Sequence, residues 1–221
     1  QNRVIEHCRP YPMEGVVAFS EPYAAATRAL MGETSSLSDL SSADFDLSDY
    51  KRRFSNLPMV MGLLCGAHIQ LLTLAGEHEQ AIAMADDDNI RISPPFISLV
   101  PIRFWSGFSY AKLAQRLPIG SAEYAKFVDG LQESLNFLQI VHDSGSIENT
   151  AHLILLLKAE RSRCERKTVA TSSLFRQAVL SAHISGFVLE EGFIAETFAE
   201  WQTVEGASRD VIMAELERAL N

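Results

Sequence analysis

The chain has 221 residues, of which 47% are hydrophobic and 21% charged, and its mean hydropathy is +0.04. This composition excludes a largely disordered protein, because it supplies enough apolar surface to bury a core. The formal net charge of -9 argues against nucleic-acid binding, since affinity for phosphates comes from clustered lysine and arginine side chains. We therefore expect a protein partner, either a separate molecule or a neighbouring domain.

The cysteines indicate a reducing compartment. Cys8, Cys65 and Cys164 are odd in number and far apart, which suits free thiols and a cytoplasmic location better than a disulfide framework. No apolar run reaches the length of about 18 residues that a membrane span needs. The chain starts at Gln1 without a recognisable signal peptide, and we expect it to be part of a longer protein.

The first predicted element is a short helix. Ser20 offers an N-cap with Pro22 close behind it, and Gly32 is a natural stop. From there to Asn56 the sequence is rich in Ser and Asp, which predicts a loop with one or two helical turns. Residues 1–56 are thus expected to form an N-terminal segment apart from the rest.

Three helices are predicted next. Residues 57–75 are nearly all apolar or small and end at Gly76, which is typical of a helix covered on most sides. Residues 77–86 follow as a shorter partner. Residues 94–118 begin with two prolines and carry apolar side chains at helical spacing, and Pro101 is expected to kink this helix or to set its start.

The second half of the chain is predicted to be helical throughout. Ser121 caps an amphipathic helix that Gly130 interrupts and Gly145 ends. Further helices are expected over residues 147–164, 168–185, 189–204 and 208–220. Strand patterns are almost absent, so the predicted class is all-α.

A helix followed by a second helix with small residues occurs more than once in the chain. The stretch LLTLAGEHEQAIAMA (residues 71–85) and the later FRQAVLSA (residues 175–182) both place small residues where two helices would cross, as in a tetratricopeptide unit. Ile69 and Asp88 occupy positions where such a unit usually has a small residue, so the match is degenerate. We expect residues 57–221 to form a tetratricopeptide-like array of helical hairpins, an α-solenoid.

Aromatic residues late in the chain fit this array. Phe193, Phe198 and Trp201 follow helical spacing, and such a stripe is typical of a core between helices rather than of a ligand cage.

The words ENTAHLILLLKAE, LFRQAVLSAHISGFVLEEGFIAETFAEW and ELERAL together resemble the tetratricopeptide-like region of very large fungal hybrid sensor histidine kinases. SLVPIRFWSGFSYAKLA and LAGEHEQAIAMAD are similar to further helices of that region. The resemblance covers residues 57–220. It implies a noncatalytic scaffold that links an ATPase module to sensor and kinase modules in phosphorelay signalling.

Motifs for chemistry are missing from the chain. It has no GxxxxGK[ST] loop, no GxGxxG and no HRD, and its six histidines form no HExxH pair or zinc spacing. The segment from His7 to Pro10 lacks the amphipathic helix that a phosphoacceptor histidine needs, and the acidic run at residues 86–88 suits a solvated loop. We therefore predict no catalytic residue, no metal ligand and no cofactor.

One charged cluster could bind a partner. Its members lie at the end of a predicted helix and in the turn after it: Lys158, Arg161, Arg163, Arg166 and Lys167. Positive charge complements the helix dipole there, which is the structural explanation, whereas a docking patch for an acidic domain surface is the functional one.

Two other functions remain open. A stand-alone adaptor, or the repeat sensor of an ATPase-type transcription regulator, would keep the fold and bind a peptide or small inducer in a groove. An all-α enzyme would require a deep pocket lined by acids or histidines.

Overall fold

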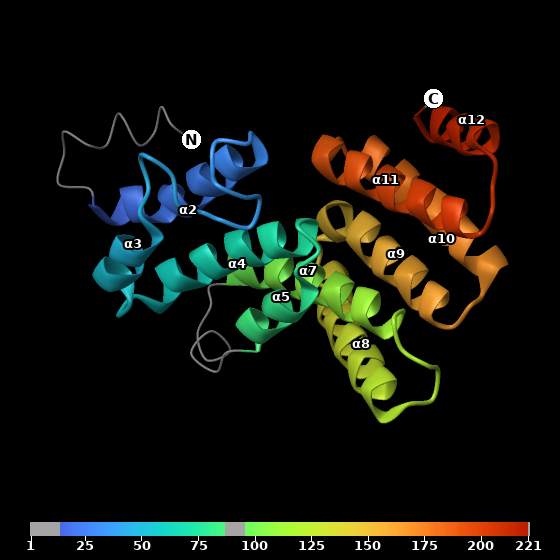
Figure 1. Ribbon diagram of the computed structural model, residues 1–221, viewed down its shortest axis with the longest axis horizontal. Coiled ribbons are helices and arrows are strands. Elements are labelled where there is room, and N and C mark those ends of the chain that lie inside the picture. The colour runs from blue at the N-terminus through green and yellow to red at the C-terminus, as the bar shows by residue number, and fades with distance from the viewer. Residues whose placement is uncertain (1–13, 87–95, 221) are drawn as a thin grey trace. The chain divides into compact units, whose positions relative to one another are not determined.

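The computed structural model describes residues 14–86 and 96–220, and every regular element in this part of the chain is a helix (Figure 1). The helices are α2 (Glu14–Leu30), α3 (Leu47–Phe54), α4 (Pro58–Leu74), α5 (His78–Ala85), α7 (Phe96–Ala114), α8 (Ala122–Asp143), α9 (Ile147–Cys164), α10 (Thr168–Ile184), α11 (Val188–Val204) and α12 (Arg209–Leu220). The all-α prediction is therefore confirmed. The expectations that involve Cys8, the segment 7–10, Asp87, Asp88 and the two prolines at 94 and 95 lie outside the described residues.

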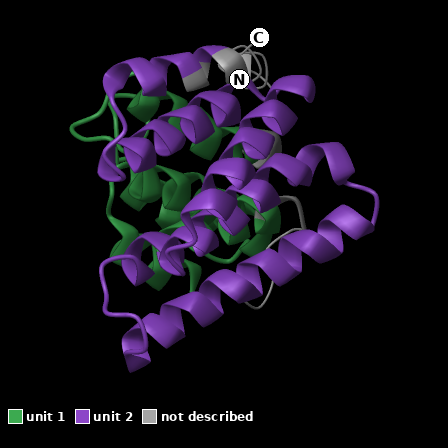
Figure 2. Cartoon of the chain, turned by 90° about the vertical axis from the view of Figure 1, so that its right-hand side faces the viewer, with its two compact units in different colours: residues 1–109 green, residues 110–221 purple. Residues whose placement is uncertain are grey.

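The chain divides into two compact units, residues 1–109 and residues 110–221 (Figure 2). In the first unit one hydrophobic cluster joins Ala18 and Ala25 of α2, Leu40 of the Ser/Asp-rich stretch, and Val60 and Leu64 of α4. The change of composition near residue 57 is therefore not where this core ends. Apolar residues scattered among serines and aspartates complete it.

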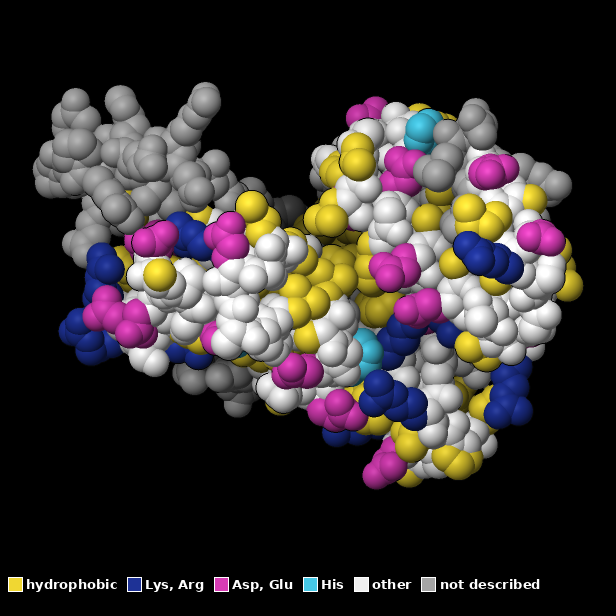
Figure 3. All heavy atoms as spheres, turned by 45° about the horizontal axis from the view of Figure 1, so that its top comes forward, with side chains coloured by type: hydrophobic (Ala, Val, Ile, Leu, Met, Phe, Trp, Pro, Cys, Tyr) yellow, Lys and Arg dark blue, Asp and Glu magenta, His cyan; other side chains and the backbone are white. Residues whose placement is uncertain are grey.

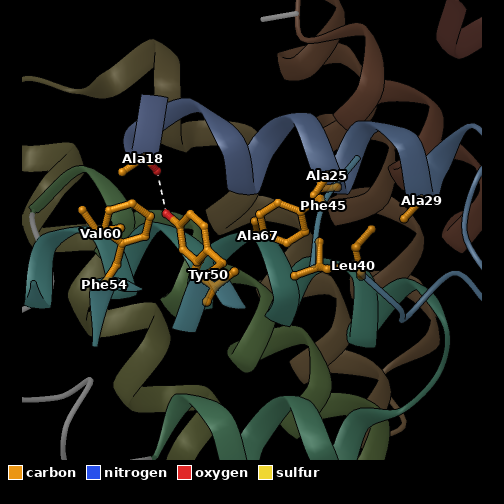
Figure 4. Packing of buried hydrophobic residues seen from close by; sticks show 12 residues of the cluster. Ala18, Ala25, Ala29, Leu40, Phe45, Tyr50, Phe54, Val60 and Ala67 are labelled. Atoms are coloured by element: carbon orange, nitrogen blue, oxygen red, sulfur yellow. Dashed lines mark hydrogen bonds between the residues drawn. The ribbon is translucent and has the colours of Figure 1, made fainter. Parts of the chain in front are cut away.

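The start of the first helix was wrongly predicted. α2 begins at Glu14 instead of following Ser20, and Pro22 lies inside the helix. A proline has no N–H, so the carbonyl oxygen of Ala18, four residues earlier, lacks its helical donor. The hydroxyl of Tyr50, from α3, donates to that oxygen at 2.5 Å (Figure 4). The helix continues through the proline because a residue distant in sequence supplies the missing hydrogen bond.

This arrangement makes the Tyr50 hydroxyl a measurable stabilising group. The Tyr50→Phe variant should lower the free energy of unfolding by about 1–3 kcal/mol, because it leaves a buried carbonyl without a donor. Urea unfolding followed by circular dichroism measures the change. Tyr23→Phe is the matched control, since the Tyr23 hydroxyl has no hydrogen bond among the described residues. Equal losses in the two variants would contradict the role given to Tyr50.

The helices after residue 57 begin and end close to their predicted positions. The Ser121 hydroxyl accepts a hydrogen bond from the backbone N–H of Tyr124 at 3.1 Å, which confirms the predicted cap of α8. Gly130 interrupts the apolar pattern for a steric reason. A Cβ atom there would lie 2.8 Å from ring atoms of Tyr110, so the ring packs directly on the glycine backbone.

Within the second unit, each helix from α8 to α11 packs against the next along the chain, and α12 packs against both α10 and α11. The predicted aromatic core is confirmed for Phe198 and Trp201, whose rings stack with Phe175 of α10 at centroid distances of 5.2 and 5.9 Å. Phe193 is only half-buried. Of the helices that the structure describes, none combines the length and the apolar character required to cross a bilayer.

Candidate functional site

The structure places the five basic residues at the end of α9 and in the turn that follows, and pairs three of them with glutamates of α9 or of its C-cap. Arg163 Nη1 lies 2.8 Å from Glu160, and Arg161 Nε lies 3.2 Å from Glu165. Lys167 Nζ lies 2.5 Å from Glu165, and this hydrogen bond lowers the pKa of the Glu165 carboxyl. Three of the five cations are therefore paired, and two glutamates supply the opposite charge.

The other two members of the cluster, Lys158 and Arg166, are exposed and have no ion pair with any described residue. Figure 3 likewise shows acidic and basic side chains interspersed on the face that it draws, without one large basic area. Of the predicted partner-binding residues, these two present unpaired charge to solvent.

Behind the cluster lies a buried ionic network that the sequence did not reveal. The Glu160 side chain is 0% exposed, and its carboxylate accepts a hydrogen bond from Gln115 Nε2 at 2.5 Å in addition to its contact with Arg163. Lys112 of α7 lies 4.0 Å from Glu160 and 3.6 Å from Glu200. In sequence Lys112 and Glu160 stand at ordinary helical positions, so only the contact of the end of α7 with α9 buries them.

A pocket of about 240 Å³ opens beside this network. Its polar lining comes from four segments of the second unit, together with the indole of a tryptophan: Gln115, Tyr124, Arg163, Arg166, Trp201 and Glu205. The Tyr124 hydroxyl donates to the carbonyl oxygen of Cys164 at 3.1 Å and so ties the start of α8 to the end of α9. Of the two arginines that line the pocket, Arg163 is paired with Glu160, whereas Arg166 is exposed.

A second pocket, of about 420 Å³, shares Trp201 and Glu205 with the first. Its other polar residues are Thr168, Ser172, Ser173 and Arg176 of α10 and Gln202 of α11. Gln202 is 7% exposed, and its side-chain oxygen has no hydrogen-bond partner in the structure. The oxygen is buried, so its lost hydration is not offset by a hydrogen bond and it should reduce stability.

The turn after α9 differs from the other turns of the second unit. Arg166 has φ 57°, the left-handed conformation that glycine adopts in the turns after α8, α10 and α11. Its hydrogen bonds are nonetheless the same. Arg166 N donates to Arg163 O at 2.9 Å, as Gly186 N donates to His183 O at 3.1 Å. An arginine thus occupies a backbone position that favours glycine. This replacement is the one feature of the sequence that could have drawn attention to the pocket.

The arginine at this position should cost stability. The Arg166→Gly variant is expected to raise the free energy of unfolding by about 1 kcal/mol, because only the side chain makes the left-handed conformation unfavourable. The opposite result is expected for Lys158→Gly, where the glycine falls inside helix α9 and should cost about 1 kcal/mol. Urea unfolding of both variants measures the two changes. A lower free energy of unfolding for Arg166→Gly would contradict the view that the arginine side chain disfavours the left-handed conformation.

Several side chains of types used in catalysis are buried. Ser109 and His78 lie within hydrogen-bond distance, with Oγ and Nδ1 3.2 Å apart, but Ser109 is 0% exposed. Burial raises the pKa of the Cys164 thiol to about 11, so the reactive thiolate is scarce at neutral pH. Burial also lowers the pKa of His152 to about 4, and its ring stacks on Phe187. In residues 14–86 and 96–220 no group of three or more metal-binding side chains occurs.

Comparison with known proteins finds no matching family model, no curated relative and no matching solved structure. The geometry of the second unit and its two pockets therefore carries the functional argument.

Proposed function

We propose that this chain is a noncatalytic helical-repeat scaffold of the tetratricopeptide-like kind, which holds or binds other proteins. The observation that carries the proposal is the recurring turn. α8, α9, α10 and α11 each end in a left-handed residue with the same backbone hydrogen bonds, as at Gly145, Arg166, Gly186 and Gly206. Alternate turns stand about 40 residues apart, close to the length of the longer helical-hairpin repeats.

The packing of the second unit supports the same proposal. α10 packs against α9, α11 and α12, so a helix meets both its neighbours and the helix after next. Serial packing of this kind is what a stacked hairpin array requires, since each hairpin buries its apolar side against the next one. In such an array a partner that binds one face can tilt successive hairpins and pass a rearrangement along the stack.

We further propose that the scaffold belongs to a cytoplasmic multidomain histidine kinase and links its ATPase and sensor or kinase modules in a phosphorelay. The support is the sequence resemblance over residues 57–220, together with the burial of Cys164, His152 and Ser109, which leaves these groups without access to a substrate. Any nucleotide chemistry would then lie in other domains of the parent protein.

Recovery of the coding sequence on both sides of this chain tests the proposal. Kinase-like and nucleotide-binding ATPase domains are expected before it, and a GAF domain and a phosphoacceptor domain after it. A reading frame that encodes only this helical region would instead establish the stand-alone adaptor. A DNA-binding domain beside an ATPase domain would establish the transcription regulator.

Partner binding by the basic cluster fits this scaffold. The partner would be an acidic surface of a neighbouring domain, and the charges available to it are those of Lys158 and Arg166, because Arg161, Arg163 and Lys167 are held by glutamates. Replacement of Lys158 and Arg166 by glutamate should weaken binding to the acidic neighbouring domain, measured by titration calorimetry with that domain expressed separately. Unchanged affinity would remove the cluster from the proposal.

A further inference from the structure

His152, near the start of α9, is buried with one ring nitrogen unpaired. The residue is 1% exposed, and its Nδ1 atom has no hydrogen-bond partner among the described residues. The imidazole stacks on the ring of Phe187, with centroids 4.5 Å apart and an angle of 28° between the ring planes. Phe187 is the N-cap of α11 and belongs to the turn between α10 and α11. The stack therefore holds this turn against α9.

Two other histidines lie at the same end of the second unit, and both have polar partners. Nδ1 of His142, at the end of α8, lies 3.0 Å from the Thr150 hydroxyl. His183, at the end of α10, is exposed, and its Nδ1 lies 3.1 Å from Glu191 Oε1. A proton on His183 would thus meet a carboxylate. Of these three rings, only that of His152 would bring its proton into an aromatic contact.

No charge in the described part of the chain offsets a proton on His152. Burial lowers the pKa of this histidine to about 4, and a hydrogen bond to the Glu148 backbone opposes the shift only in part. The acidic groups that the surrounding helices place at this end are Asp143 of α8, Glu148 of α9, Glu190 and Glu191 of α11 and Glu217 of α12. None of them contributes to the pKa of His152 through its charge.

We propose that His152 is an acid-sensitive latch for the turn between α10 and α11. The neutral ring packs on Phe187 and holds the turn, whereas a protonated ring must reach water and so releases the turn from α9. The pKa of His152 in the folded chain lies below its ordinary value of 6.5. The stabilising effect of the neutral ring is therefore complete above about pH 6.5 and is lost as the pH falls toward 4. The latch goes beyond the scaffold function, because it adds a condition under which the stack loosens.

Hydrogen exchange of the whole chain at about pH 7.5 and about pH 5, followed by mass spectrometry, tests the latch. The amides of Phe187 and Glu191, which donate to the carbonyl oxygens of Ala182 and Phe187, report on the turn. After correction for the intrinsic pH dependence of exchange, the turn should open about 30-fold more often at the lower pH. The reason is that an exposed imidazole takes up a proton in this range and the buried ring does not.

Two variants separate His152 from other acid effects. His152→Phe keeps an aromatic ring against Phe187 and removes the titrating group, so it should abolish the increase. His152→Gln, an uncharged polar replacement, should also abolish it and serves if the phenylalanine variant does not fold. His183→Asn is the matched control, because it removes an exposed histidine beside the same turn and should retain the increase.

Either of two results would overturn the latch. One is an increase of the same size in the His152 variants. The other is an equal increase at the turn after α9, for example at the Lys167 amide, which would show that acid loosens the whole unit and not this turn. Neither result bears on the scaffold proposal, because that proposal is tested by the neighbouring coding sequence.

Discussion

Replacement of Glu160 by leucine is expected to lower the free energy of unfolding by about 3–5 kcal/mol, the usual effect of removing one partner from a buried ion pair. The carboxylate is fully buried and meets Arg163 at 2.8 Å, Lys112 at 4.0 Å and the Gln115 amide at 2.5 Å. Leucine fills similar space but leaves the Arg163 and Lys112 charges in the interior with less compensation. The charges then destabilise the folded state.

Urea unfolding measures this effect most cleanly through Trp201. The chain has two tryptophans, so a Trp105→Phe background leaves a fluorescence signal from the second unit alone. Glu165→Ala is the matched control, because Glu165 also pairs with two cations but is partly exposed. The control should lose no more than about 1 kcal/mol. Similar decreases in the free energy of unfolding for the two variants would show that the burial of Glu160 adds nothing to the effect of removing it.

The Phe198→Ala variant should also lower the free energy of unfolding by about 3–5 kcal/mol, as large-to-small changes of a buried aromatic residue do. Phe198 is fully buried and forms a cluster with Phe175 and Trp201, whose ring centroids lie 5.2 and 5.9 Å from its own. Alanine would leave a cavity between α10 and α11. The Phe175 and Trp201 rings already contact each other, at a centroid distance of 5.9 Å, so filling the cavity requires α10 and α11 to shift.

Circular dichroism during urea unfolding is the suitable measurement here, because the change alters the surroundings of Trp201 and hence its fluorescence. Phe198→Leu serves as the control, since leucine refills much of the volume and should limit the loss to about 1–2 kcal/mol. Equal decreases in the free energy of unfolding for Phe198→Ala and Phe198→Leu would show that the cavity is not the cause of the loss.

The second unit contains both residues that stabilise it and residues that reduce its stability. Phe198 and Glu160 stabilise the packing of the end of α7 with α9, α10 and α11, whereas the left-handed backbone of Arg166 and the buried, unpaired oxygen of Gln202 reduce stability. A stable stack can carry such unfavourable positions, because the total stability is shared among many buried contacts.

The sequence by itself determined the helices and most of their ends. Capping by Ser121 and left-handed glycines such as Gly76 and Gly186 act through hydrogen bonds within a few residues, so a local pattern is sufficient to predict them. The apolar periodicity late in the chain likewise predicted two of three aromatic core residues correctly, whereas Phe193 is only half-buried. Phe198 and Trp201 are in the core, as expected.

Only the tertiary structure decided the rest, because it depends on residues far apart in the chain. In the sequence, Pro22 indicates the start of a helix. In the structure it lies inside α2, and the Tyr50 hydroxyl donates to the Ala18 carbonyl oxygen. In the sequence, nothing distinguishes Glu160 from a solvated helix residue. In the structure it is buried beside Lys112 and Gln115. The first pocket forms where the end of α9 and the turn after it meet α11, and the second forms between α10 and the end of α11, so each joins residues that no local pattern relates.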